Sequence, residues 1–582
     1  MPDRRFKRIF AILSGFLNFE LPAKNRHKLK RHTLAAWWLV LVFGLLTIGV
    51  AGICREGDPG KTRIHIADNG DGTFTNPVMP NAHWSDPCLL RVKDDFYCMT
   101  SSAETCPLMQ VLHSRDLVNW DVVGSVLRRW PDDLPSVMNW SPRISYLNGR
   151  YRVMFHITEW GFRVMEAEKP EGPWHYVQHH FGKMDTQWGA NVFTDDDGAL
   201  YMIATNWIQR LAPDALSFAG ERIPAVQGHV LENPSLIKKD GYYYWFESQN
   251  GTCTLGNQPD KGRVDVWRSR NVTGPYEGPH ELIRANDRFQ SPNTGTVVLG
   301  PDHRWWIAYN EYDMLRFTMC RQMHLDLLEW DENGWPSVNK GNGPGLKYRK
   351  PIDTERPTWF PDLNDEFDQP ELEGVTTGIL GRKWLFKREL PGAWSLREHP
   401  GWLRLTTMYP AIQEMNCANL ICQRPTSAYY SISTHLIFHP RQRWQQAGII
   451  VRELNTTNTI AIGLDFDPIM KLKVWQNNGA GLKEIAAKNL FSKQPDTIPE
   501  GEVYLKIDME GMVAQCSFSM DNVTWTRLGP GWPAFNVIPW QDGYFTAFHP
   551  GLFSGETVET PSAGYADFDY FHMENYERLS TQ

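Results

Sequence analysis

The chain has 582 residues, enough for two or more domains that each bury a core of their own. Its formal net charge of −8 and its pI near 6.2 exclude the basic face of a typical nucleic-acid-binding protein, so no nucleic-acid partner is expected. Aromatic residues make up 13 % and include 25 tryptophans, a content that suits large β-cores and also surfaces that stack on sugar rings.

The N-terminal segment has the composition of a membrane anchor. Residues 1–34 form a basic tail with nine Lys or Arg, and residues 35–53, "AAWWLVLVFGLLTIGVAGI", carry no charge. Nineteen apolar residues are enough to cross a bilayer as a helix, and a basic block before them predicts a cytoplasmic N-terminus. We therefore expect a single-pass signal-anchor at 35–53 that binds the membrane, a linker at 54–75, and an extracellular or lumenal remainder. A cleaved signal peptide, giving a secreted protein, is the alternative.

Between residues 76 and 352, a weak pattern of a turn followed by an aromatic strand recurs five times. The instances are "KDDFYCMTSS", "NGRYRVMFHI", "DDDGALYMIA", "KDGYYYWFES" and "PDHRWWIAYN". They lie roughly 40 to 60 residues apart, which is the spacing of four-stranded propeller blades. The pattern predicts a five-bladed β-propeller over residues 76–352. A two-sheet sandwich with the same hairpin frequency is the alternative.

A polar residue stands at the start of the strand that precedes each of these instances. In a propeller such strands are innermost and surround the central axis, so residues at their starts should converge on one pocket. These residues are Asp86, Ser141, the segment 189–191, Glu232 and Asn293.

Two of the converging residues are carboxylates, Asp86 and Glu232. An Asp and a Glu opposed across a pocket fit glycoside hydrolysis, in which one activates water and the other donates a proton to the leaving oxygen. Glu232 has the more apolar sequence neighbours, which suits the general acid, and the more acidic Asp86 suits the general base. The alternative is that both residues only cap turns. Trp84 and Trp140 are candidate substrate-binding residues, with packing in the blade core as the alternative.

From about residue 356 the pattern changes to short alternating strands separated by turns. Examples are "GWLRLTTM", "YYSISTHLIF", "TIAIGLDF" and "VYLKIDMEG". The pattern predicts an antiparallel two-sheet β-sandwich over residues 356–582, and a carbohydrate-binding module fits it equally well. The predicted fold class is therefore all-β, with a transmembrane helix, a five-bladed propeller and a β-sandwich in that order.

The ordered set of motifs resembles glycoside hydrolase family 43, especially its β-xylosidase branch. "NAHWSDPCLLRVKDDFYCMTSS" and "LHSRDLVNWDVVG" are similar to the opening of that family's propeller, and "WSPRISYLNGRYRVMF", "ENPSLIKKDGYYYWFES" and "RSRNVTGPYEG" resemble its later blades. The resemblance extends over most of residues 68–582. It implies a five-bladed propeller, a concanavalin-like C-terminal sandwich, and inverting hydrolysis of xylosides or arabinosides. Matched motif by motif, it implies Asp86 as general base, Glu232 as general acid, and Arg321 as an arginine that reaches the substrate.

Two positions depart from the family's pattern. The family's third carboxylate, an Asp that orients the acid, falls on Gly189 of this chain. Asp185 could fill that role if its loop bulges, or Asn191 could hydrogen-bond the acid instead. In the fifth blade, where the family often has a histidine, Asn293 or Thr294 is expected to face the pocket.

The family's sandwich can close one side of the pocket, so we expect an inverting exo-glycosidase that acts on the ends of xylo-oligosaccharides. Its partner would be an oligosaccharide or cell-wall polysaccharide, with no cofactor and no metal site. An α-L-arabinofuranosidase of the same fold is one alternative, and a catalytically weak propeller that binds carbohydrate is another, favoured by Gly189. Five N-x-Ser/Thr sequons predict a glycoprotein. They begin at Asn139, Asn250, Asn271, Asn455 and Asn522.

Overall fold

The computed structural model describes residues 67–576 with several gaps. The residues within this range that lie outside the description are 80–81, 103–104, 130–138, 158–160, 183, 185–188, 229–231, 250–261, 355–362, 370–382, 455, 491–499, 534–546 and 562. Residues 1–66, which include the predicted basic tail and anchor, also lie outside it.

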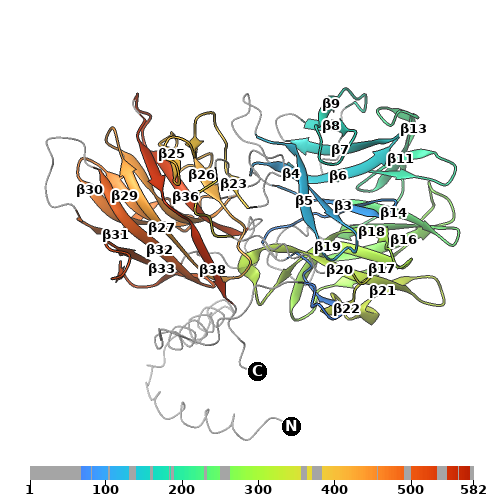
Figure 1. The fold of residues 1–582 in the computed structure, drawn as a ribbon. Helices are drawn as coiled ribbons and strands as arrows, with labels where there is room; N and C mark the ends of the chain where they lie inside the picture. Colours follow the sequence, from blue (N-terminus) through green and yellow to red (C-terminus); the bar gives the residue numbers. More distant parts are fainter. Residues whose placement is uncertain are drawn as a thin grey trace, which may run out of the picture. The chain divides into compact units, whose positions relative to one another are not determined.

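The first part of the described chain forms five four-stranded antiparallel sheets, each built from strands that are consecutive in sequence (Figure 1). The blades are β2 (Cys88–Val92), β3 (Asp95–Met99), β4 (Leu108–Ser114) and β5 (Asp121–Leu127); β6 (Asn139–Leu147), β7 (Arg150–Ile157), β8 (Gly161–Ala167) and β9 (His175–Val177); β10 (Asn191–Thr194), β11 (Leu200–Ala204), β12 (Trp207–Leu211) and β13 (Phe218–Pro224); β14 (Glu232–Lys239), β15 (Tyr242–Gln249), β16 (Arg263–Ser269) and β17 (Glu277–Arg284); and β18 (Phe289–Leu299), β19 (Trp305–Asp313), β20 (Arg321–Trp330) and β21 (Pro336–Val338). The five-bladed propeller predicted from the repeats is confirmed.

The first strands of the blades form a closed ring. Strand β2 contacts β6, β6 contacts β10, β10 contacts β14, β14 contacts β18, and β18 contacts β2 again. Because the ring closes on itself, the innermost strands come from all five blades and surround one axis. The residues at the starts of these strands therefore surround one axis and are candidates for a shared site.

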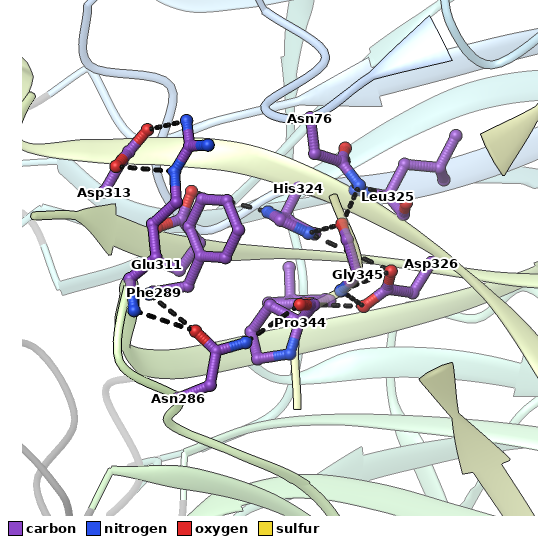
Figure 2. A network of polar contacts seen from close by, with 12 residues as sticks. Asn76, Asn286, Phe289, Glu311, Asp313, His324, Leu325, Asp326, Pro344 and Gly345 are labelled. Carbon is purple, nitrogen blue, oxygen red and sulfur yellow. Dashed lines mark hydrogen bonds and ion pairs between the residues drawn. The ribbon is translucent and has the colours of Figure 1, made fainter. Parts of the chain in front are cut away.

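The propeller is fastened by contacts between the segments before and after its blades. Strand β1 (Thr73–Thr75) pairs antiparallel with β22 (Lys347–Arg349). The buried side chain of Asn76 donates from Nδ2 to the carbonyls of Leu325 at 2.8 Å and Gly345 at 2.9 Å, and its Oδ1 accepts the Leu325 amide at 3.1 Å (Figure 2). One side chain thus bonds to blade five and to the segment that follows it.

A fully buried pair of titratable residues lies in the same network (Figure 2). His324 Nε2 lies 2.8 Å from the Gly345 carbonyl, which can only accept, so this nitrogen carries the proton. Burial lowers the pKa of His324, so the ring is neutral and its Nδ1 is an acceptor. Glu311 Oε1 lies 3.4 Å from that Nδ1, and burial raises the pKa of Glu311 well above its ordinary value. Glu311 is therefore the donor in this contact, as a neutral carboxylic acid.

Replacing Glu311 with Gln is expected to raise the melting temperature at pH 8 and to leave it nearly unchanged at pH 4. Because the pKa of Glu311 is higher in the folded protein than in the unfolded chain, the unfolded chain loses this proton at lower pH. The stability that the neutral group contributes is therefore present at pH 4 and is lost as the pH rises toward the folded-state pKa. Gln donates the same hydrogen bond and does not titrate, so it removes this loss. Calorimetric melting temperatures at the two pH values test this, with exposed Glu332→Gln as the control. An equal shift at both pH values would contradict the assignment of Glu311 as neutral.

The second part of the described chain forms two packed sheets. One has the order β23-β26-β36-β28-β29-β30-β31, and the other has the order β24-β25-β37-β27-β32-β33-β34, with β35 paired to β33 and β38 paired to β27. The strands are β23 (Leu385–Phe386), β24 (Trp394–Ser395), β25 (Leu403–Thr406), β26 (Leu420–Cys422), β27 (Tyr429–His439), β28 (Gln445–Glu453), β29 (Thr459–Phe466), β30 (Met470–Asn477), β31 (Lys483–Lys488), β32 (Gly501–Glu510), β33 (Val513–Ser519), β34 (Thr526–Arg527), β35 (Trp532–Pro533), β36 (Phe548–Glu556), β37 (Tyr565–Phe568) and β38 (His572–Tyr576). In β32, Val503, Leu505, Ile507 and Met509 are buried in alternation and share one core with Ile449 and Ile462 of the other sheet. The predicted β-sandwich is confirmed.

The propeller and the sandwich belong to one compact unit, Thr62–Gln582. The Ala82 amide donates to the Pro425 carbonyl at 2.8 Å, and Cys106 and Phe386 exchange two backbone hydrogen bonds of 2.7 and 2.9 Å. The first of these contacts places the sandwich against the segment that leads directly into Asp86.

The predicted fold class is corrected at its N-terminal element. No helix among the described residues is long and apolar enough to cross a membrane, and the predicted anchor at 35–53 lies outside them. Nineteen apolar residues meet the length condition for a span, but composition alone does not place a helix in a bilayer. The single-pass localisation and the membrane partner depended on that helix and are corrected with it. The predicted glycosylation depended on the same orientation and has no support.

Candidate active site

Five residues with an unusual backbone conformation mark the starts of the inner strands. Asp86 (φ 55°), Ser141 (φ 48°), Gly189 (φ 72°), Asn233 (φ 59°) and Ser291 (φ 50°) hold one equivalent position in each blade. All but Gly189 are followed by proline, and the strand register shifts at this point in the second, fourth and fifth blades. A bulge of this kind re-aims side chains, and the left-handed conformation is costly for residues other than glycine. Its recurrence shows that the propeller uses one local structure at the start of each inner strand, and this structure presents a side chain in every blade except the third, where Gly189 has none.

Asp86, which is 3 % exposed, lies in a polar network built from several blades. Arg321 Nη1 donates to Asp86 Oδ1 at 3.1 Å, the Ser101 hydroxyl donates to Oδ2, and the Asp86 amide donates to Asn310 Oδ1 at 2.7 Å. The Ser141 amide donates to Ser101 Oγ at 2.7 Å, which adds the second blade. Arg321 supplies the positive charge that a buried carboxylate requires, and the other donors hold the group in one orientation.

The two candidate tryptophans have different surroundings. Trp84 is 2 % exposed in the core of the first blade, with the guanidinium of Arg424 4.1 Å from its ring. Trp140 is half-buried, and the guanidinium of Arg321 lies 5.7 Å from its ring. Trp140 therefore lies beside the arginine that binds Asp86, whereas Trp84 is packed between the propeller and a sandwich residue.

The sandwich supplies further basic side chains at this point. The ring of His83 lies 6.4 Å from that of His549, and both are buried. Burial lowers the pKa of His83 well below its ordinary value and that of His549 to about 3, so both rings are neutral. Burial also lowers the pKa of Arg424 to about 10, which leaves it charged at neutral pH. His83 thus lies near Arg321, the arginine that binds Asp86, and near His549 and Arg424 from the sandwich.

Glu232 is the first residue of β14, is half-buried, and pairs with Ser248 of β15. The next residue, Asn233, is 2 % exposed, and its side chain lies over Gly189 of the third blade. A Cβ built on Gly189 would lie 1.9 Å from Asn233 Oδ1 and 2.9 Å from Arg143 Nη2. Atoms do not approach so closely, so the Asn233 amide fills the volume that a side chain at position 189 would need.

Arg143, which is 2 % exposed, extends this contact to the other blades. Its Nη1 lies 3.5 Å from the Pro87 carbonyl and 3.4 Å from Thr296 Oγ1. Arg143 Nε and Nη2, and Asn233 Oδ1, have no hydrogen-bond partner among the described residues. Contacts therefore link the starts of inner strands from all five blades, with unused hydrogen-bonding capacity at Arg143 and Asn233.

A further carboxyl group near Glu232 comes from β15. Glu247 is fully buried, its Oε2 accepts Trp245 Nε1–H at 2.7 Å, and its Oε1 has no hydrogen-bond partner among the described residues. Burial raises the pKa of Glu247 well above its ordinary value, and the charge of Glu232 raises it further. Glu247 therefore favours its neutral form beside Glu232.

The remaining candidates are distributed around the ring. Asn191 begins β10, and its Oδ1 accepts the Val192 amide at 2.9 Å. Asn293 is fully buried, and its Oδ1 accepts the Asn310 amide group, so it joins the Asp86 network. Asp185 lies outside the described residues. The part of the chain that the structure describes holds no group of three side chains able to bind a metal ion.

Two family models match the chain along its length. The model described as "Glycosyl hydrolases family 43" matches residues 74–336, and the "Beta xylosidase C-terminal Concanavalin A-like domain" matches residues 364–574. The chain belongs to glycoside hydrolase family 43. Its family 43 sequence thus includes both the catalytic propeller and the sandwich of the β-xylosidase branch.

Relatives in family 43 are similar over most of the chain. A xylan 1,3-β-xylosidase from a Vibrio species is 25 % identical over 566 residues, covering 86 % of this chain and 98 % of the relative. A non-reducing end α-L-arabinofuranosidase from Bacteroides ovatus is 27 % identical over 417 residues, covering 65 % of this chain and 74 % of the relative. A solved family 43 structure from Bacillus licheniformis is 26 % identical with a TM-score of 0.74, covering 87 % of this chain and all of the other. The predicted enzyme class, a glycoside hydrolase, is confirmed.

The sequence prediction did not include Asn233, Arg143 or Glu247 in the site. Asn233 and Arg143 flank the prolines that follow two inner-strand starts, so the recurring X-Pro pair is a signal that could have located them. Glu247 is two residues from Trp245 in β15, and strand alternation places it on the same buried face. Because acidic residues are rarely fully buried, an acidic residue on a buried strand face is the sequence signal that could have located Glu247.

Proposed function

We propose that the protein is an inverting exo-glycosidase that removes xylose from the ends of β-linked xylo-oligosaccharides. The observation that carries this proposal is the environment of Asp86, a buried carboxylate bound by Arg321 and Ser101 at the inner ring of a family 43 propeller. We assign residues 76–352 to catalysis and residues 356–582 to a sandwich that restricts the pocket to chain ends.

In the proposed mechanism, Asp86 is the general base and Glu232 is the general acid. Asp86 takes a proton from the water that attacks the anomeric carbon, while Glu232 donates its proton to the leaving oxygen. Arg321 keeps the Asp86 carboxylate in place, and Trp140 contributes an aromatic face beside it. Asn191 is proposed to bind a sugar hydroxyl, Asn293 to support the substrate-binding site through its hydrogen bond with Asn310, Asp185 to modulate the acid, and Trp84 to support the substrate-binding segment by packing. No cofactor is needed for this reaction.

The first experiment is to follow the product's anomeric form. The full chain is expected to hydrolyse 4-nitrophenyl β-D-xyloside and xylobiose, and proton NMR at early times should show α-xylose before mutarotation, because inversion changes the anomeric configuration. Initial formation of β-xylose would contradict the inverting mechanism.

The same assay separates the alternatives. Turnover of 4-nitrophenyl α-L-arabinofuranoside without turnover of the xylosides would favour an arabinofuranosidase, the activity for which the Bacteroides ovatus relative is named. Binding of xylobiose with no turnover of any substrate would favour a carbohydrate-binding propeller, for which Gly189 in place of a carboxylate is the supporting observation.

A further inference from the structure

A hollow of about 370 Å³ lies on the seven-stranded sheet of the sandwich, and every residue that lines it belongs to the sandwich. Its walls come from β28, β29 and β30 and from the turn that leads into β28. The side chains that line it include Gln413, Trp444, Gln446, Asp465, Lys473 and Trp475. The volume is within the range of pockets that hold small ligands, roughly 300–1,000 Å³.

The strand register places a pair of glycines next to the hollow. Gln446 pairs with Asp465, and two residues further along the same strands Gly448 pairs with Gly463. Residues two apart on a strand face the same side, so the two glycines leave this face without side chains next to Gln446 and Asp465. Lys473 pairs with Gly463 and completes this row.

Trp444 stands at the hollow in a costly conformation. Its φ of 71° is left-handed, which is a genuine outlier for a bulky side chain and costs about 1–3 kcal/mol. Backbone bonds fix it there, because its amide donates to the Phe466 carbonyl at 2.8 Å and its carbonyl accepts the Thr557 amide at 2.9 Å. The side chain is nevertheless 38 % exposed, so the strain is not offset by burial of the ring. A strained aromatic side chain presented to solvent indicates a binding surface.

Two side-chain amides at the hollow, one in a buried and one in a half-buried residue, have atoms with unused hydrogen-bonding capacity. Gln446 is 1 % exposed, and neither its Nε2 nor Gln413 Oε1 has a hydrogen-bond partner among the described residues. One is a donor and the other an acceptor, which together match a hydroxyl group. Leaving such groups unsatisfied costs about 1–3 kcal/mol each, and a bound ligand with hydroxyls would remove that cost.

The charged groups at the hollow are already paired with each other. Lys473 Nζ lies 2.8 Å from Asp465 Oδ2 and 3.2 Å from Glu484 Oε2, and Arg443 Nη2 lies 2.6 Å from Asp467 Oδ1. A charged ligand would have to compete with these ion pairs, whereas a neutral polar ligand can hydrogen-bond to them as they stand. The ligand that fits is therefore neutral, rich in hydroxyls, and flat enough on one face to stack on Trp444.

We propose that this hollow is a second carbohydrate-binding site, which holds a neutral oligosaccharide segment by stacking on Trp444 and by hydrogen bonds to Gln446 and Gln413. It is separate from the ring of inner strands and does not depend on the catalytic roles proposed for Asp86 and Glu232. Its effect would be to hold the enzyme on a polysaccharide while the propeller acts on chain ends.

Binding of xylohexaose by titration calorimetry tests the second site. The full chain carrying Glu232→Gln is expected to bind two equivalents of xylohexaose. Adding Trp444→Gly is expected to weaken the affinity of the sandwich site at least about tenfold, so that only one equivalent is detected. Wild-type and Trp444→Gly proteins should hydrolyse 4-nitrophenyl β-D-xyloside equally. Consumption of xylohexaose by the Glu232→Gln protein would count against the acid assignment and not against the second site.

Stability separates a binding role of Trp444 from a structural one. Glycine adopts a positive φ without strain, so Trp444→Gly should keep or raise the melting temperature while it removes the second binding event. Trp525→Gly, at the turn before β34 of the other sheet, is the control and should leave both equivalents bound. A single equivalent in the parent, or two equivalents that survive Trp444→Gly, would overturn the proposal.

Discussion

Asp86→Asn is expected to lower kcat by about 10³-fold for 4-nitrophenyl β-D-xyloside and for xylobiose alike, which is within the range for loss of a general base. The amide keeps the shape of the carboxylate but cannot take the proton of the attacking water. This step is shared by all substrates, so the loss should not depend on the leaving group. Steady-state rates on the two substrates measure it, and Asp197→Asn, the same change at an exposed turn, should have no effect.

Glu232→Gln should instead produce a loss that depends on the leaving group. Nitrophenolate leaves without protonation, whereas the alcohol of xylobiose needs a proton, so kcat should fall much further for xylobiose than for the aryl xyloside. The comparison therefore distinguishes the acid from the base within one assay. Equal losses on both substrates would contradict the assignment of Glu232 as the acid, and a leaving-group dependence in Asp86→Asn would exchange the two roles.

The architecture could be predicted from sequence because its signals are local. Each blade repeats a turn and an aromatic strand within a few tens of residues, and apolar residues alternate with period two in the sandwich strands. These patterns predict both the propeller and the sandwich from sequence alone. Asp86 and Glu232 were located by their place at the start of an inner strand, which is also a local signal. The predicted membrane helix shows the limit of this approach, because an apolar run alone does not define its surroundings.

The surroundings of the site could not be predicted because they depend on contacts between distant segments. Trp84 is compatible in sequence with either a sugar platform or a core residue, and its burial follows from the first blade's core together with Arg424, which comes from the sandwich. His549, which also comes from the sandwich, lies close to His83. Gly189 stands where the family has its third carboxylate, but the sequence does not indicate which residue occupies the volume of the absent side chain.

The structure indicates that Gly189 is small because Asn233 occupies the volume above it. Its backbone does not require glycine, since Asp86, Ser141, Asn233 and Ser291 adopt the same left-handed conformation at the equivalent position. The constraint is the Asn233 side chain, 1.9 Å from where a Cβ would lie. The two positions should therefore be coupled, next to Glu232 in the sequence.

Gly189→Asp alone is expected to destabilise the protein by about 1–3 kcal/mol, as overpacking of a buried site does. The same change should cost little when Asn233→Gly is present, so the two effects are not additive. Melting temperatures of the wild type, both single variants and the double variant measure the coupling, and this readout does not require activity. Equal losses from Gly189→Asp in both backgrounds would contradict the shared volume.

The double variant should also move the alkaline limb of the kcat/KM profile to higher pH, because a new carboxylate disfavours loss of the proton that Glu232 must keep. The titratable and charged groups already around this point are Arg143, the neutral Glu247 and the Asp86–Arg321 pair, and none of them is altered by the substitutions. Gly189→Ala with Asn233→Gly relieves the clash without adding charge, so it should restore stability but leave the limb in place. Asn233→Asp, which adds the charge without changing volume, should move the limb in the same direction as the double variant. If the alkaline limb stays in place both in the double variant and in Asn233→Asp, then Asn233 only fills space, because packing alone does not change where the acid titrates.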